Sequence, residues 1–114
     1  MTHIVTLDWP SQKSSMNSRA HWKQKADYQK SQKQLAAEDC KHLPRCEHKN
    51  DIPVTIIFSP PDKRRRDADN LLSSIKTSLD AIAAQIGVDD SRFWPVTLEK
   101  EYGDSADVKI ILHY

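Results

Sequence analysis

The sequence predicts an α+β fold in the order β-α-β-α-β-β, with two main helices packed on one mixed or antiparallel sheet. Segments with alternating or β-branched residues occur near both ends and in the middle of the chain, which is typical of strands. Between them lie a long stretch without glycine or proline and a shorter one with apolar residues at helical spacing, which indicate helices. The 114 residues fit one domain, 1–114.

The first half of the chain is expected to supply one strand and one helix. Residues 2–9 alternate, with Val5, Leu7 and Trp9 on one face, and Pro10 ends this strand. Residues 11–18 are polar and predict a loop. Residues 19–43 contain no glycine or proline and are rich in Ala, Gln, Lys and Leu, which favours a helix. Because its apolar stripe is thin, we expect this helix to be half-exposed.

The second half is expected to supply a strand, a helix and a hairpin. Residues 54–58 are β-branched or aromatic and form the clearest strand. Residues 70–86 carry apolar side chains at a spacing of roughly 3.6 residues, which predicts a single helix that Gly87 terminates. Residues 96–102 and 108–114 alternate on either side of a turn at 103–107, so we expect them to pair as a hairpin.

The composition is that of a globular protein, with 38% hydrophobic and 29% charged residues. No run is long and apolar enough to cross a membrane, and the first residues do not resemble a signal peptide. We therefore expect the protein in the cytoplasm, without a membrane partner.

The two cysteines admit two interpretations. In a cytoplasmic protein they are expected to be free thiols. Alternatively, the segment 40–48 could bind zinc, although its ligand spacing differs from that of the usual paired-ligand sites. The four residues concerned are Cys40, His42, Cys46 and His48.

The net charge of +1 hides an uneven distribution. Residues 1–66 contain 13 Lys and Arg and 7 Asp and Glu, a net charge of +6, whereas residues 67–114 contain 4 and 9, a net charge of −5. A basic half beside an acidic half suits a protein that binds a polyanion with one surface and cations with another. An ordinary solvated surface with uneven charge explains the same numbers.

The chemistry is expected where the two halves meet. Asp67 and Asp69 follow four consecutive basic residues, 63–66, and in an extended chain their carboxylates point to the same side. Carboxylate oxygens are the ligands that Mg²⁺ prefers, and the cation would polarise a phosphodiester and help to generate the attacking hydroxide. Alternatively, one of the two acids caps the following helix. The other acid would then lack an explanation.

The predicted helix 70–86 adds further polar residues on one flank. At roughly 100° per residue, Asp69, Ser73, Lys76 and Asp80 lie within about 60° of one another. A lysine there could contact a phosphate oxygen or the leaving group. A Lys76–Asp80 ion pair between successive turns explains the same spacing equally well.

A third carboxylate, Asp90, follows Gly87. A straight helix of about 15 residues is roughly 22 Å long, and the few residues after it reach back at most about 14 Å. Asp90 is therefore not expected beside Asp69 of its own chain. Two chains packed antiparallel about a two-fold axis would instead form two composite sites, each with Asp90 of the partner subunit.

In combination, these motifs resemble the RusA-type Holliday-junction resolvases. The resemblance is carried by FSPPDKRRRDADNL at 58–71, by Lys76 and Asp80, and by GVDDS at 87–91. It extends to the first strand, the segment 17–22 and the last two strands. The resemblance implies a homodimeric nuclease, of a kind often carried by phages and prophages, that uses Mg²⁺ or Mn²⁺ to make paired nicks across four-way DNA junctions.

The resemblance also implies roles for single residues. The catalytic, metal-binding carboxylates correspond to Asp67, Asp69 and Asp90, and the functional lysine corresponds to Lys76. A few more residues separate Asp69 from this lysine than in shorter family members, and counting forward from Asp69 would place Ser73 there instead. The residues expected to bind the junction arms are Lys63, Arg64, Arg65, Arg66, Arg19 and Lys23. The main alternatives are a branched-DNA-binding protein without activity and a metal-dependent nuclease that acts on another nucleic acid.

Overall fold

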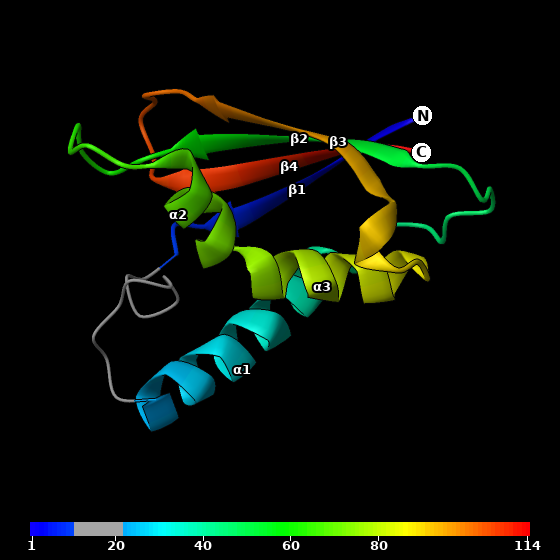
Figure 1. Cartoon of the computed structure of the whole chain (residues 1–114), viewed down its shortest axis with the longest axis horizontal. Coiled ribbons are helices and arrows are strands. Elements are labelled where there is room, and N and C mark those ends of the chain that lie inside the picture. The colour runs from blue at the N-terminus through cyan, green and yellow to red at the C-terminus, as the bar shows by residue number, and fades with distance from the viewer. Residues whose placement is uncertain (11–21) are drawn as a thin grey trace.

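The computed structural model describes residues 1–10 and 22–114, the side chains of residues 22–25 excepted, so the predicted loop 11–18 lies outside the described residues. In chain order the elements are β1 (Thr2–Asp8), α1 (Trp22–Asp39), β2 (Ile52–Ser59), α2 (Ala68–Ser74), α3 (Lys76–Ile86), the short 3₁₀ helix η2 (Asp90–Arg92), β3 (Phe93–Lys100) and β4 (Asp107–His113). The α-helices lie on one side of a four-stranded mixed sheet (Figure 1). The predicted α+β class is therefore confirmed.

The sheet order is β1-β4-β2-β3, and the expected hairpin between the last two strands is wrong. β4 lies between β1 and β2 and is antiparallel to both, whereas β3 runs parallel to β2 at the other edge. The inward side chains of this central strand are fully buried, with Val108, Ile110 and Leu112 each 0% exposed. β3 is mostly exposed. Residues 101–106 carry the chain past the end of β2, where Glu101 donates a backbone hydrogen bond to Phe58.

Alternation along the strands buries one face of the sheet. In β1, Val5 and Leu7 are buried, and Trp9 just beyond the strand packs against the core, as the pattern predicts. In β2, Ile56 and Phe58 are buried in the same way, and the ring of Phe58 meets that of Trp9 edge-on at 6.1 Å between centroids. Removing these apolar side chains from water is the main source of stability for the fold.

The predicted helix 70–86 is two helices, because the chain breaks at Ile75. This residue has φ −113° and ψ 11°, and it both ends α2 and precedes α3. Two serines come before the break, and the Ser74 hydroxyl donates a 2.6 Å hydrogen bond to the carbonyl oxygen of Leu71. Such local bonds compete with helix continuation. The predicted end of the helix is confirmed, since Gly87 adopts the left-handed conformation with φ 79°.

α1 is half-exposed, as its thin apolar stripe predicts. Ala36 is buried, whereas Leu35 is 60% exposed. The helix packs mainly against α3 and touches the β1 edge of the sheet (Figure 1). It falls within the predicted range 19–43, of which residues 19–21 lie outside the described residues. No helix in the part of the chain that the structure describes is long and apolar enough to cross a membrane.

Candidate active site and nucleic-acid interface

The first two carboxylates lie where α2 begins. Asp67 is extended, with φ −88° and ψ 143°, whereas Asp69 lies in the first helical turn, so the extended-chain premise holds for Asp67 alone. Both residues are exposed. Asp67 occupies the capping position, but its side chain makes no capping hydrogen bond. Helix capping therefore does not account for its carboxylate.

Lys76, at the start of α3, forms ion pairs with two acids. Its Nζ lies 2.6 Å from Asp90 Oδ2 and 3.6 Å from Asp80 Oδ1. The predicted Lys76–Asp80 ion pair between successive turns is thus present, but the contact with Asp90 is the shorter one. The hydrogen bond to Asp90 raises the pKa of Lys76, and the same bond lowers the pKa of Asp90. Lys76 is therefore protonated at neutral pH.

The short helix η2 brings Asp90 to this position. Asp89 caps η2 by accepting a 2.9 Å hydrogen bond from the backbone N–H of Ser91. Asp89 thus has a structural role, and Asp90 is the acid that faces Lys76.

The three predicted metal ligands do not form one cluster within the chain. Among residues 1–10 and 22–114, no three His, Cys, Asp or Glu side chains are placed to hold a metal ion together. The straight helix expected between Asp69 and Asp90 is wrong, because the chain bends at Ile75 (Figure 1). A composite site that includes a second subunit remains a prediction.

Ser73 and Lys76 differ in what they can reach. Ser73 Oγ is buried and has no hydrogen-bond partner within the described part of the chain, whereas the Lys76 side chain is 61% exposed. The four polar residues Asp69, Ser73, Lys76 and Asp80 were expected on one flank of a single helix. They do not share one flank, because Asp69 and Ser73 lie in α2 whereas Lys76 and Asp80 lie in α3. Of the two side chains, Lys76 is therefore the one that a ligand in solvent can reach, and its role as the functional lysine stays a prediction.

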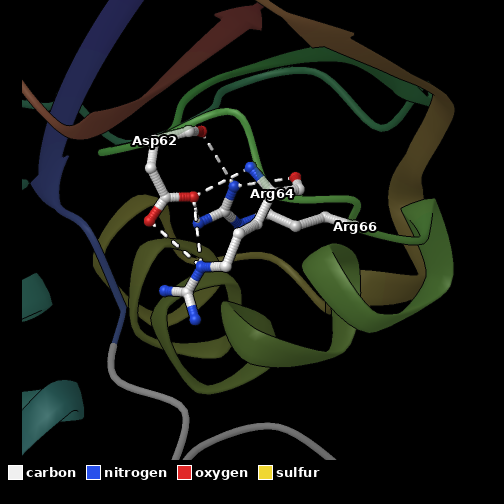
Figure 2. A network of polar contacts seen from close by, with 3 residues as sticks. All are labelled: Asp62, Arg64 and Arg66. Carbon is white, nitrogen blue, oxygen red and sulfur yellow. Dashed lines mark hydrogen bonds and ion pairs between the residues drawn. The ribbon is translucent and has the colours of Figure 1, made fainter.

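The basic loop, residues 62–66, is organised around Asp62 (Figure 2). The Asp62 carboxylate accepts hydrogen bonds from the backbone N–H of Arg64 at 2.9 Å and from its Nε at 3.2 and 3.1 Å. It also accepts one from Nη2 of Arg66 at 2.9 Å. Arg66 Nη1 donates to the carbonyl oxygens of Asp62 and Arg64 at 3.0 and 3.1 Å. These bonds, above all the one from the Arg64 side chain, lower the pKa of Asp62 to about 2.

Two basic side chains of this loop rest on aromatic rings. The Arg66 guanidinium lies 5.3 Å from the centroid of the Trp9 ring, and Lys63 Nζ lies 5.9 Å from that of Tyr102. Both are cation–π contacts. The Arg66 side chain is only 15% exposed, against 67% for Arg64, so more of Arg64 than of Arg66 is accessible to a ligand in solvent.

Of the other residues expected to bind DNA, only Arg65 has a side chain that the structure describes. Arg65 is exposed. Arg19 lies outside the described residues, and for Lys23 the structure describes only the backbone, in α1. The predicted interface is therefore represented here by the basic loop.

Sequence reasoning missed the partners that organise this loop. In an Asx turn, an aspartate side chain accepts a hydrogen bond from the backbone N–H two residues later. The position of Asp62 two residues before Arg64 could therefore have indicated its role. Trp9 and Tyr102 lie far from the loop in the sequence, and no local pattern connects them with it.

The four residues of the zinc alternative face separate partners. Cys40 is buried, and its thiol donates to a carbonyl oxygen of α1. His42 contacts a carbonyl oxygen of β1, and the Cys46 thiol donates to the carbonyl oxygen of His48. Both cysteines are free thiols. Since no metal-binding group occurs among the described residues, the structure does not support the zinc alternative.

The fold and this site define a class of protein. It is a small α+β protein whose exposed carboxylates directly follow an arginine-rich loop, an arrangement suited to metal-assisted chemistry on a polyanion. The family model described as Endodeoxyribonuclease RusA matches residues 8–113. The chain belongs to this RusA endodeoxyribonuclease family.

A sequence relative is found in a bacterium. The chain is 35% identical over 96 residues to an uncharacterized protein of Xylella fastidiosa (strain Temecula1), in an alignment that covers 78% of this chain and 61% of that protein. The chain thus spans less than two thirds of the length of this relative.

Proposed function

We propose that the protein is a homodimeric, Mg²⁺-dependent endodeoxyribonuclease that resolves Holliday junctions by paired phosphodiester hydrolysis. Membership of the RusA endodeoxyribonuclease family supports this proposal. The observation that carries it is the position of Asp67 and Asp69, whose exposed side chains directly follow the basic loop. A loop of this kind binds the phosphate backbone and brings phosphate esters within reach of the acids.

The donor set fits Mg²⁺. The ion would be held by Asp67 and Asp69 together with Asp90 of the partner subunit, because hard carboxylate oxygens are its preferred ligands. The Asp67 carboxylate takes no part in capping α2, which leaves it available. When bound, the ion supplies positive charge that polarises the scissile phosphate. Mn²⁺ is expected to substitute, since it accepts the same oxygen ligands.

Lys76 supplies a second positive charge. The hydrogen bond to Asp90 raises the pKa of its ammonium group, so the group carries its charge at neutral pH. From this position it contacts a non-bridging phosphate oxygen, where negative charge develops as water attacks phosphorus. The enclosed hydroxyl of Ser73 offers no comparable charge.

A second subunit completes each site in this proposal. One chain does not gather its three acids into a cluster among the described residues. A two-fold dimer would place Asp90 of each subunit beside Asp67 and Asp69 of the other. Two centres related by a two-fold axis suit a four-way junction, which is itself two-fold symmetric and must be cut in two strands.

Cleavage of a labelled synthetic four-way junction tests the proposal. We expect paired cuts near the branch point with Mg²⁺ or Mn²⁺, none with EDTA, and little cutting of linear duplex DNA. Asp69→Asn should abolish cleavage while junction binding persists. The matched control is Asp51→Asn, the same change at an exposed position before β2, which should cut like the wild type.

Other outcomes point to other functions. Tight junction binding without cleavage at any metal concentration would favour a branched-DNA-binding protein without activity. Cutting of linear DNA or of RNA as fast as the junction would favour a nuclease with a different substrate. If the protein neither binds nor cleaves the junction, that result would contradict the proposal outright.

A further inference from the structure

A small cavity lies between the end of β1 and the basic loop. Two segments far apart in the sequence form its lining, and its volume is about 260 Å³. The cavity is open to solvent on one side and is large enough for a phosphate group with its neighbouring atoms. The lining residues are Trp9, Pro10, Pro61, Arg64, Arg65 and Arg66.

Arg66 is anchored at this cavity. Three of the five N–H donors of its guanidinium bind oxygens of Asp62 and Arg64. The guanidinium also rests on the Trp9 ring. Among residues 1–10 and 22–114, its Nε–H and its second Nη2–H have no hydrogen-bond partner. These two donors are available to a ligand while the side chain is held in place.

Asp62 orients the second arginine as well. Its carboxylate binds Nε of Arg64, and Figure 2 shows the two Nη groups of Arg64 pointing away from it. One carboxylate thus fixes two guanidinium groups. Electrostatic attraction of DNA does not explain why an aspartate lies in this loop, because a negative charge among four basic residues lowers the positive potential of the loop. The contribution of Asp62 is therefore geometric.

We infer that this cavity is a preformed site for one phosphate group of the DNA strand, and that Asp62 is the positioning residue that holds Arg64 and Arg66 for it. The inference rests on the proposed function, since DNA supplies the phosphate. Arginine binds phosphate through parallel N–H donors in a fixed plane. Fixing that plane before binding reduces the conformational entropy that binding would otherwise remove.

The place of this phosphate along the strand follows from the chain. Arg66 immediately precedes Asp67, and consecutive Cα atoms are about 3.8 Å apart. The phosphate in the cavity is therefore held by the residue adjacent to the proposed metal ligand Asp67. Its binding sets which phosphodiester of the strand reaches the carboxylates.

Substitution of Asp62 distinguishes a positioning role from a purely electrostatic one, because the two roles predict opposite changes in the affinity for a four-way junction. Asp62→Asn raises the net charge by one, so a purely electrostatic loop would bind a four-way junction more tightly. The positioning role predicts the reverse: in EDTA the Kd rises roughly fivefold or more. The salt dependence of binding should also become shallower by about one phosphate contact.

Asp51→Asn is the matched control for this test. It makes the same change of charge at the opposite end of β2, roughly 26 Å along the strand, and it should not weaken binding. Arg66→Lys adds a variant at unchanged charge. Because lysine lacks the parallel donor pair, the Kd should again rise about fivefold. Binding as tight as the wild type in both Asp62→Asn and Arg66→Lys would overturn the inference.

NMR titration observes the cavity directly. The indole N–H resonance of Trp9 should shift when inorganic phosphate or a 5′-phosphorylated dinucleotide is added, and the shift should be much smaller in Asp62→Asn. An unmoved Trp9 signal with both probes would overturn the inference, whatever the cleavage assay shows. A shifting signal in a protein that cuts no junction would retain the cavity site and contradict the proposed function instead.

Discussion

At the scale of single residues, the contact between Lys76 and Asp90 has more consequence for chemistry than for stability. Both side chains are partly exposed, at 61% and 35%, and ion pairs in such surroundings contribute little to the free energy of folding. The pair does fix a positive charge beside a carboxylate assigned to the metal. Such a fixed charge stabilises a transition state without reorganising first.

Replacing the lysine tests this role. Lys76→Met should lower the rate of junction cleavage about 100-fold or more, because one fixed charge near the phosphate is lost. The pKa of Asp90, measured by carboxyl NMR, should rise toward its ordinary value. Lys41→Met is the control, since Lys41 also forms an exposed ion pair, with Glu38 at 2.7 Å. An unchanged cleavage rate in Lys76→Met would remove this lysine from the chemistry.

The lowered pKa of Asp62 predicts that the free energy of unfolding depends on pH in the acid range. Its pKa is lowered from 3.8 to about 2 in the folded protein, so its charged form stabilises the fold above the unfolded pKa. That contribution is lost as the pH falls through the folded value. Urea unfolding should therefore show a difference between wild type and Asp62→Asn near pH 5 that shrinks toward about pH 2. A difference that is the same at both pH values would contradict the lowered pKa.

At the scale of elements, the position of β4 decides the shape of the sheet. Its inward side chains are fully buried, whereas β3 at the edge stays largely exposed. The parallel pairing of β2 and β3 requires a long crossover, and α2, α3 and η2 supply it. This crossover, residues 60–92, carries all of the proposed catalytic residues.

A matched pair of substitutions tests which face of the sheet is buried. Ile110 of β4 is 0% exposed and Ile4 of β1 is 52% exposed. Ile110→Ala should lower the free energy of unfolding by about 3 kcal/mol, because it leaves a cavity in the core. Ile4→Ala should change it by roughly 0.5 kcal/mol. Equal effects in denaturant unfolding would contradict the observed burial of Ile110 and exposure of Ile4.

The sequence predicted local features better than long-range ones, for a physical reason. Alternation shows which face of a strand is buried, so Val5 and Leu7 were placed correctly. It does not show which strand lies next to which, so the pairing of the last two strands was predicted wrongly. The helical spacing of residues 70–86 likewise showed the buried face but not the break at Ile75.

The same limit applies to the candidate site. Asp67 and Asp69 could be singled out because they adjoin the basic run in the sequence. The contact of Lys76 with Asp90 depends on a return of the chain over 14 residues, and that of Arg66 with Trp9 depends on the whole fold. No local pattern encodes either contact.

At the scale of the whole molecule, one chain holds half of each proposed site. The basic loop and the start of α2 supply two acids and the phosphate-binding arginines. The third acid lies at η2, beside Lys76. A dimer with shared sites would couple the two cuts to one assembled complex, which fits a substrate with two-fold symmetry.

A heterodimer of two inactive variants tests this sharing most directly. Asp69→Asn and Asp90→Asn would be produced together with different affinity tags, and the mixed dimer would be isolated. If each site takes Asp90 from the partner subunit, the mixed dimer contains one centre with all three acids and one without two of them. It should then nick single strands of the junction at about half the rate of the wild-type dimer. If the mixed dimer is as inactive as its parents, each chain builds its site alone and the shared arrangement is wrong.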